Sequence, residues 1–178
     1  MSVYFHLRAV PPSALRNSAS WFRRLFDDDW DTVRDRIGRH REEVLDRGYL
    51  HHELLYAGVP PYRAQEGPCT HVVLGGRPIG HPDPSRPPFL LLTAAQAGRV
   101  AEYLEDTDFA DLWERAREEV MRPYGMPELE RDVRGAFAAA HRDLRAFYTQ
   151  TAHYGDAVVK WLMGSDSRLT RERDAPVG

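Results

Sequence analysis

The side chains best suited to bind or convert a ligand lie in two stretches of this 178-residue chain. Residues 49–53 read YLHHE, and residues 72–83 read VVLGGRPIGHPD, with an arginine, a histidine and an aspartate after the first glycines. Together they provide the candidate site residues Tyr49, His51, His52, Glu53, Arg77, His81 and Asp83. Loops on a rigid scaffold often carry recognition, so these groups could bind a ligand or a partner. Alternatively, they only tie down an irregular segment through backbone hydrogen bonds.

The glycines of residues 72–83 could either hold a phosphate or turn the chain. A P-loop needs a lysine and a serine or threonine after its last glycine, where a helix begins. Here a His-Pro pair follows the last glycine, and further prolines continue to Pro88. The glycine spacing also differs from that of a dinucleotide-binding loop. We therefore expect a tight turn between two strands, with Gly75 or Gly76 at positive φ.

Eight histidines raise the question of a metal site. Zinc needs three or four converging ligands, often with one pair on a single helical face. His51 and His52 are consecutive, so on a helix they point about 100° apart. We expect His40 to be a buried or half-buried helix residue, whereas His6 and His71 could meet on neighbouring strands. Because no group has ligand spacing, we predict neither a metal nor another cofactor.

Nucleophilic and paired-carboxylate catalysis find little support. Cys69 and His71 would share one face of a strand, where the imidazole could help to form a thiolate. We favour the simpler role of a small apolar residue at a strand entrance for Cys69. No serine lies in a G-x-S-x-G elbow. The Glu-Glu pairs at residues 42–43 and 118–119 are expected on solvated helix faces, since consecutive helical residues diverge.

Composition indicates a globular domain with ordinary surface charge. Hydrophobic residues make up 42% and charged residues 29% of the chain, and no apolar run is long enough to span a bilayer. The 24 basic and 27 acidic residues alternate, which excludes the basic stripe of a nucleic-acid binder. A single cysteine and the lack of a signal peptide favour the cytoplasm. We therefore expect a protein or small-molecule ligand as partner, and neither nucleic acid nor membrane.

Hydrophobic periodicity predicts a helix-rich α+β single domain with a small mixed sheet that includes both terminal strands. The expected strands are residues 2–8, 70–75 and 156–163, with residues 89–92 as a further strand or as the lead into a helix. The expected helices lie around residues 13–26, 30–44, 48–58, 93–104, 107–120 and 127–153. In the last of these, Phe137 lies in the middle of the apolar stripe, whereas His141 and Arg142 are expected to face water.

Several segments together resemble the YfbM-like domain-of-unknown-function family of small bacterial proteins. VLGGRPIG at residues 73–80 is similar to the family's LLGGxPIG, a Leu-Thr helix start falls at residues 92–93, and residues 144–162 fit LRAFYxxxAxxGDAVVxxL. The resemblance implies a compact α+β domain over residues 1–163 and brings no established activity. The family's Trp-His-x-x-His pattern is shifted at residues 49–55, so no role is transferred from it. Residues 164–178 are expected to form a disordered polar tail.

Two functions remain open at this level. The first is a non-catalytic binding or regulatory module, of an immunity-like kind. It is favoured because the sequence matches none of the catalytic motifs considered, while its loops carry a polar surface. The second is an enzyme that acts on a small polar substrate through a His/Glu/Arg cluster. A deep pocket that gathers His51 or His52 with Glu53 and Arg77 would favour the enzyme. A flat or convex surface there would favour binding.

Overall fold

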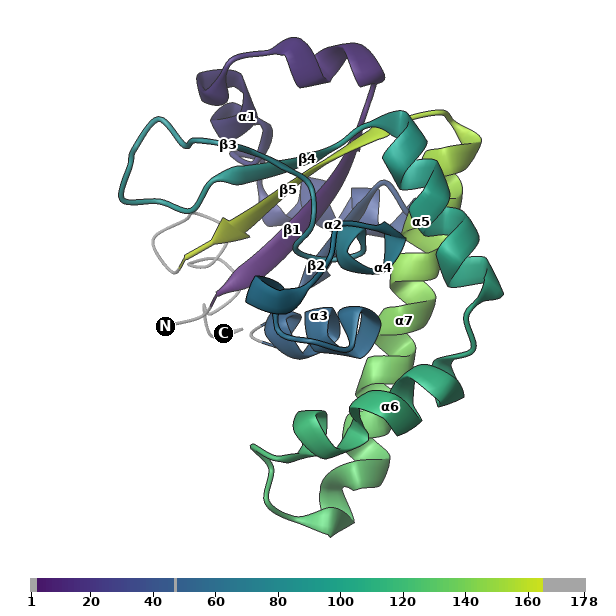
Figure 1. Cartoon of the computed structure of the whole chain (residues 1–178). Coiled ribbons are helices and arrows are strands. Elements are labelled where there is room, and N and C mark those ends of the chain that lie inside the picture. Colours follow the sequence, from purple (N-terminus) through teal and green to yellow (C-terminus); the bar gives the residue numbers. More distant parts are fainter. Residues whose placement is uncertain (1–2, 47, 165–178) are drawn as a thin grey trace.

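The centre of the fold is a five-stranded sheet in the order β2-β1-β5-β4-β3 (Figure 1). The computed structural model describes residues 3–46 and 48–164. The strands are β1 (Tyr4–Val10), β2 (Glu42–Leu45), β3 (Arg77–Ile79), β4 (Phe89–Leu92) and β5 (Ala157–Met163). The two long strands, β1 and β5, pair along their whole length, which confirms that both terminal strands share one sheet. All four strand pairs within the described ranges are antiparallel, so the expectation of a mixed sheet was wrong.

Helices cover both faces of this sheet, and they confirm the helix-rich α+β class (Figure 1). They are α1 (Ala19–Leu25), α2 (Trp30–Gly38), α3 (Tyr49–Ala57), α4 (Pro68–His71), α5 (Ala94–Asp106), α6 (Phe109–Met121) and α7 (Glu130–His153). Short 3₁₀ turns occupy Pro12–Arg16, Pro61–Arg63 and Pro127–Leu129. Helices α1 and α2 pack on one face, whereas α3, α4, α5 and α7 cover the other. None of the helices in the described ranges is long and apolar enough to cross a membrane.

Strand β5 contributes to two separate cores because successive side chains point to opposite faces. Val159 and Trp161 pack against α1 and α2, together with Phe22 and Phe26. Val158 packs into the larger core under α5 and α7. Every residue of β5 except the half-buried Leu162 is therefore buried, as expected of a central strand covered on both sides.

Residues 30–45 differ from the single long helix that the sequence predicts. Helix α2 starts as expected, since Asp29 accepts the Thr32 N–H at 2.8 Å, but it ends at Gly38. His40 lies in the following turn at φ 55°, exposed rather than half-buried in a helix. The chain then forms β2, where Glu42 and Glu43 are 1% and 9% exposed and not on a solvated helix face. The prediction was wrong because Val44 falls on the helical spacing while pairing with β1 holds it in a strand.

Burial raises the pKa of Glu43 from its ordinary 4.5 to about 7, assisted by the nearby carboxylates of Asp143 and Glu42. The folded protein thus holds this proton more tightly than the unfolded chain. The associated stability is fully present below about pH 4.5 and is lost as the pH rises through about 7. Replacing Glu43 by glutamine should therefore raise the free energy of unfolding by about 1–3 kcal/mol at pH 8.5 and leave it unchanged at pH 4.

Urea unfolding at both pH values tests this prediction. Glu118→Gln is the matched control, because Glu118 is exposed on α6 and should respond at neither pH. An equal effect of Glu43→Gln at pH 4 and pH 8.5 would show that the carboxyl group does not titrate in this range.

The predicted strand at residues 70–75 is also wrong. Pro68 opens the short helix α4, in which Cys69 is half-buried, so this cysteine does not mark a strand entrance. The hairpin strands are instead β3 and β4, and FLLL at 89–92 is a strand. Thr93 and Gln96 then form the expected capping box, with hydrogen bonds of 2.9 and 3.2 Å.

The two glycines before β3 are required by close approaches of the backbone. A Cβ at Gly75 would lie 2.5 Å from the carbonyl oxygen of Thr70. Gly76 has φ +131°, and a Cβ there would lie 2.9 Å from the carbonyl oxygen of Leu91. The expected turn with a glycine at positive φ is therefore present at Gly76, although it precedes the hairpin rather than joining two strands.

Helix α7 confirms the longest predicted helix and corrects its phase. Phe137 is buried and Arg142 is exposed, as expected. His141, expected in water, is 5% exposed, and its Nδ1 lies 3.0 Å from the Tyr56 hydroxyl. The buried stripe therefore runs through His141 rather than through its half-buried neighbour Ala140. Disorder was predicted for residues 164–178, of which residues 165–178 lie outside the described part of the chain.

Candidate functional site

The only lysine of the chain, Lys160, lies fully buried in the middle of β5. Its Nζ donates hydrogen bonds to the carbonyl oxygens of His71, of Val73 at 2.8 Å and of Gly75 at 3.0 Å. Burial lowers the pKa of Lys160 to about 7, while the carboxylate of Glu53 acts in the opposite direction. Three acceptors match the three N–H groups of an ammonium. Lys160 thus fixes the segment that runs from α4 to the turn at Gly75 and Gly76, which we call the glycine turn.

Tyr148 on α7 provides a second anchor for the same segment. It is fully buried, and its hydroxyl group approaches the carbonyl oxygens of Val72 at 2.8 Å and His71 at 3.1 Å. The backbone between α4 and β3 forms no regular ladder, so these side chains satisfy carbonyl groups that would otherwise be buried unpaired.

Glu53 on α3 is a third side chain that anchors the segment between α4 and β3. Its side chain is 1% exposed, and its Oε2 accepts the backbone N–H of Leu74 at 2.9 Å. Burial raises the pKa of Glu53, whereas the Leu74 N–H and Lys160 lower it.

A cavity of about 490 Å³, which we call the Glu53 pocket, opens beside this carboxylate. It lies between α3, α4, α5 and the glycine turn. Its wall consists of Glu53, Pro61, Ala64, Glu66, Thr70, Leu74, Gly75, Gly76, Arg77, Pro78 and Gln96. The glycine turn therefore builds one wall of a pocket, and Glu53 is a buried carboxylate in that wall.

The neighbouring His52 faces a different cavity. Its ring stacks on Phe137 with centroids 4.3 Å apart, and it is 6% exposed. Because α3 turns by about 100° per residue, His52 and Glu53 point to different flanks of the helix. Tyr49 is half-buried and stacks on Phe5 at 5.6 Å, while His51 is half-buried.

The second candidate stretch lies largely on the opposite face of the sheet. The ring of His81 stacks on Trp161 at 5.2 Å, and its Nδ1 accepts the N–H of Asp83 at 3.0 Å. Asp83 is exposed and accepts hydrogen bonds from the backbone and side chain of Ser85. Arg77 borders the Glu53 pocket and is exposed, but it pairs with Leu91, whose side chain belongs to the core under α1 and α2. Cross-strand partners share a face, so the Arg77 side chain leaves the sheet away from Glu53.

Of the seven candidate residues, only Glu53 and Arg77 therefore border a common pocket, and only Glu53 extends its side chain into the wall. None of the candidate histidines His51, His52 and His81 lines the Glu53 pocket. The described residues contain no group of three or more His, Cys, Asp or Glu side chains placed to hold a metal ion. In particular, His6 meets Glu42 at 3.1 Å rather than His71.

Sequence reasoning missed the importance of Lys160 and Tyr148. A signal for Lys160 was present, since a lone lysine interrupts the apolar strand AVVKWLM. A buried lysine in a central strand needs acceptors on the elements that cover it. Tyr148 gave no such signal, because a tyrosine on an apolar helix stripe is ordinary core.

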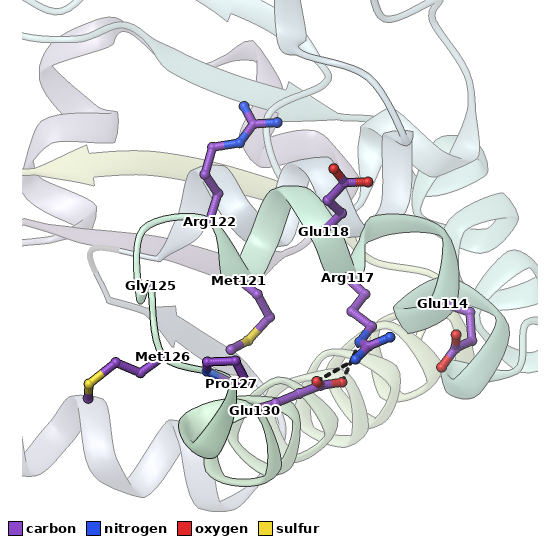
Figure 2. Close-up of a pocket in the computed structure, with 9 residues that line it drawn as sticks. All are labelled: Glu114, Arg117, Glu118, Met121, Arg122, Gly125, Met126, Pro127 and Glu130. Carbon is purple, nitrogen blue, oxygen red and sulfur yellow. Dashed lines mark hydrogen bonds and ion pairs between the residues drawn. The ribbon is translucent and has the colours of Figure 1, made fainter.

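A separate pocket of about 560 Å³ lies at the far end of the molecule, between α6 and the start of α7 (Figure 2). Met121 points into it, and Arg117 forms two hydrogen bonds of 2.6 and 2.7 Å with Glu130 across it. It contains none of the seven candidate residues. Because Arg117 and Glu130 pair with each other, neither of these two charged groups is left for a ligand.

Comparison with known proteins gives a family and a fold. The family model described as "Domain of unknown function (DUF1877)" matches residues 1–161. A solved structure described as a protein of unknown function, YfbM from Escherichia coli, matches with a TM-score of 0.60 and 13% sequence identity. The match covers 92% of this chain and 100% of that chain, and at this identity it shows the fold alone. No curated protein gives a significant match.

Proposed function

Because the chain belongs to the DUF1877 family, whose function is unknown, we propose a function from its own side chains: non-catalytic binding of a small polar ligand in the Glu53 pocket. The family membership and the shared fold confirm the YfbM-like resemblance seen in the sequence. The observation that carries the proposal is a buried carboxylate, fixed in place by a backbone N–H, in the wall of a preformed cavity.

Glu53 determines which ligands fit. Among the described residues, its carboxylate accepts a hydrogen bond only at Oε2, which leaves Oε1 for a ligand. The exposed Glu66 adds a second carboxylate at the rim. The pocket therefore selects a ligand with a hydrogen-bond donor or a positive charge, and the apolar wall of Pro61, Leu74 and Pro78 accommodates its carbon skeleton.

Binding is favoured over catalysis because neither a candidate histidine nor the Arg77 side chain lies beside Glu53 in the pocket. His52 faces another cavity, and the Arg77 side chain projects from the face of the sheet opposite to Glu53. Lys160, whose low pKa would suit an amine nucleophile, is fully buried and donates to three carbonyl oxygens. An enzyme acting through a His/Glu/Arg cluster would need all three side chains within reach of one substrate.

A module that binds a ligand without converting it serves regulation, and we propose such a role, comparable with that of immunity proteins. We place it in the cytoplasm, because its single cysteine, Cys69, forms no disulfide within the chain and suits a reducing compartment.

Screening a library of small amines, alcohols and carboxylic acids by NMR tests the proposed function. Compounds with a donor or ammonium group should perturb the amides of Leu74, Gly75 and Gly76. Glu53→Gln keeps an acceptor for the Leu74 N–H and removes the charge, so it should weaken binding of an amine about tenfold. Glu119→Gln, on the exposed face of α6, is the matched control and should bind as the natural protein does.

The same experiment distinguishes the two functions. A compound that perturbs the pocket and is recovered unchanged supports binding. Conversion of a bound compound would support the enzyme instead. If no compound perturbs these amides, the Glu53 pocket is not a ligand site.

A further inference from the structure

A second cavity, of about 530 Å³, lies on the other flank of α3, between β2, the start of α3 and α7. We call it the His52 pocket. It is lined by Tyr4, Val44, Leu45, Asp46, Gly48, His52, Tyr124, Ala136, Phe137 and Ala140. It shares no residue with the Glu53 pocket, so a ligand site here is independent of the proposed function.

His52 is a buried polar group of this pocket without a complete set of partners. The side chain is 6% exposed, and its Nδ1 has no hydrogen-bond partner among the described residues. Burial lowers the pKa of His52 to about 4, which keeps the imidazole neutral at physiological pH. A buried polar atom that lacks a partner costs stability, and in native proteins such atoms concentrate where a ligand or water completes the site.

The size of the cavity has a local cause. Three of its lining residues, Gly48, Ala136 and Ala140, have small side chains or none. Ala136 and Ala140 are four residues apart on α7 and therefore lie on the same side of the helix. Larger side chains at these positions would fill the space above His52.

The remaining lining groups define the charge of the ligand. Asp46 is exposed, and it is the only charged side chain among the described residues that line the pocket. Two tyrosines, Tyr4 and Tyr124, and the phenyl ring of Phe137 provide aromatic walls, and Tyr124 is 39% exposed. Aromatic faces attract cations, and sites for quaternary ammonium groups combine such rings with a carboxylate.

We propose that the His52 pocket binds an organic ammonium ion. The cation lies against the aromatic walls, with its charge balanced by Asp46, and a polar substituent of the ligand hydrogen-bonds to the imidazole of His52. Neutral His52 is suited to this role, because a protonated imidazole beside the cation would repel it.

Choline is the probe, and 3,3-dimethylbutan-1-ol, its uncharged carbon isostere, is the matched control ligand. Both are titrated into the full chain at pH 7.5 and followed by the amide and histidine ring signals in NMR. We expect choline to shift the signals of Gly48, His52 and Ala136, and the neutral isostere to bind at least tenfold more weakly.

Substitutions then separate the contributions of charge and ring. Asp46→Asn keeps the acceptor for the Gly48 N–H and should weaken choline binding about tenfold. Tyr124→Leu should weaken it about three- to tenfold. Tyr62→Leu serves as the control for an exposed tyrosine outside the pocket and should change nothing. Equal binding of the two ligands would overturn the proposal, as would choline shifts confined to other parts of the molecule or absent altogether.

Discussion

Replacing Lys160 by methionine is expected to lower the free energy of unfolding by about 3–5 kcal/mol. Methionine has a similar length and no donor, so the substitution removes three hydrogen bonds and retains the packing volume. The carbonyl groups of His71, Val73 and Gly75 would then lose their donor under a buried strand. Equilibrium unfolding in urea at pH 7.5 measures the effect.

Two further variants make this result interpretable. Arg142→Ala removes a charged side chain from the exposed face of α7 and should change stability by less than about 0.5 kcal/mol. Tyr148→Phe removes only the hydroxyl group that anchors the same segment and should cost about 1–2 kcal/mol. If Lys160→Met is as stable as the natural protein, the three carbonyl groups have other donors and Lys160 does not anchor the glycine turn.

The second large effect is expected at Phe137, where alanine should cost about 3–5 kcal/mol. The ring is 5% exposed and lies between His52, at 4.3 Å, and Trp113, at 5.9 Å. Its removal leaves a cavity that joins the His52 pocket, so water can enter and reach the imidazole. Urea unfolding measures the loss of stability, and the NMR titration of His52 should show its depressed pKa moving up toward 6.5.

His141→Ala gives a useful comparison on the same helix. His141 is buried and bonded to Tyr56, so its loss should also destabilise, although it removes a smaller ring. A Phe137→Ala protein that unfolds at the urea concentration of the natural protein would mean that the start of α7 contributes little to the core.

The sequence predicts well those elements whose pattern extends over several turns. Helices α5 and α7 and strands β1 and β5 are confirmed. In each of them, apolar residues recur at the helical or strand spacing more often than expected by chance. Strand β2 and helix α4 have four residues each, too few for a period to emerge. At β2 the spacing of Val44 happened to continue the helical stripe, and only pairing with β1 decides its conformation.

The candidate site was predictable in part. Glu53 was selected for its residue type, and it does line a pocket. Its relation to Lys160 was not accessible, because the two residues are distant in sequence and meet only when α3 packs on the sheet. The phase error at His141 has the same origin: a tyrosine from α3 provides the partner that makes a buried imidazole acceptable.

The position of β5 has a consequence for how the protein is made. This strand lies between β1 and β4, so the two halves of the sheet are joined only by residues near the C-terminal end of the described chain (Figure 1). A nascent chain on the ribosome can form its helices early, but β1 has to wait with one edge unpaired until synthesis reaches Met163. During that interval the exposed edge is a target for chaperones and for aggregation. Folding of this domain is therefore expected to complete only after translation has passed its last strand.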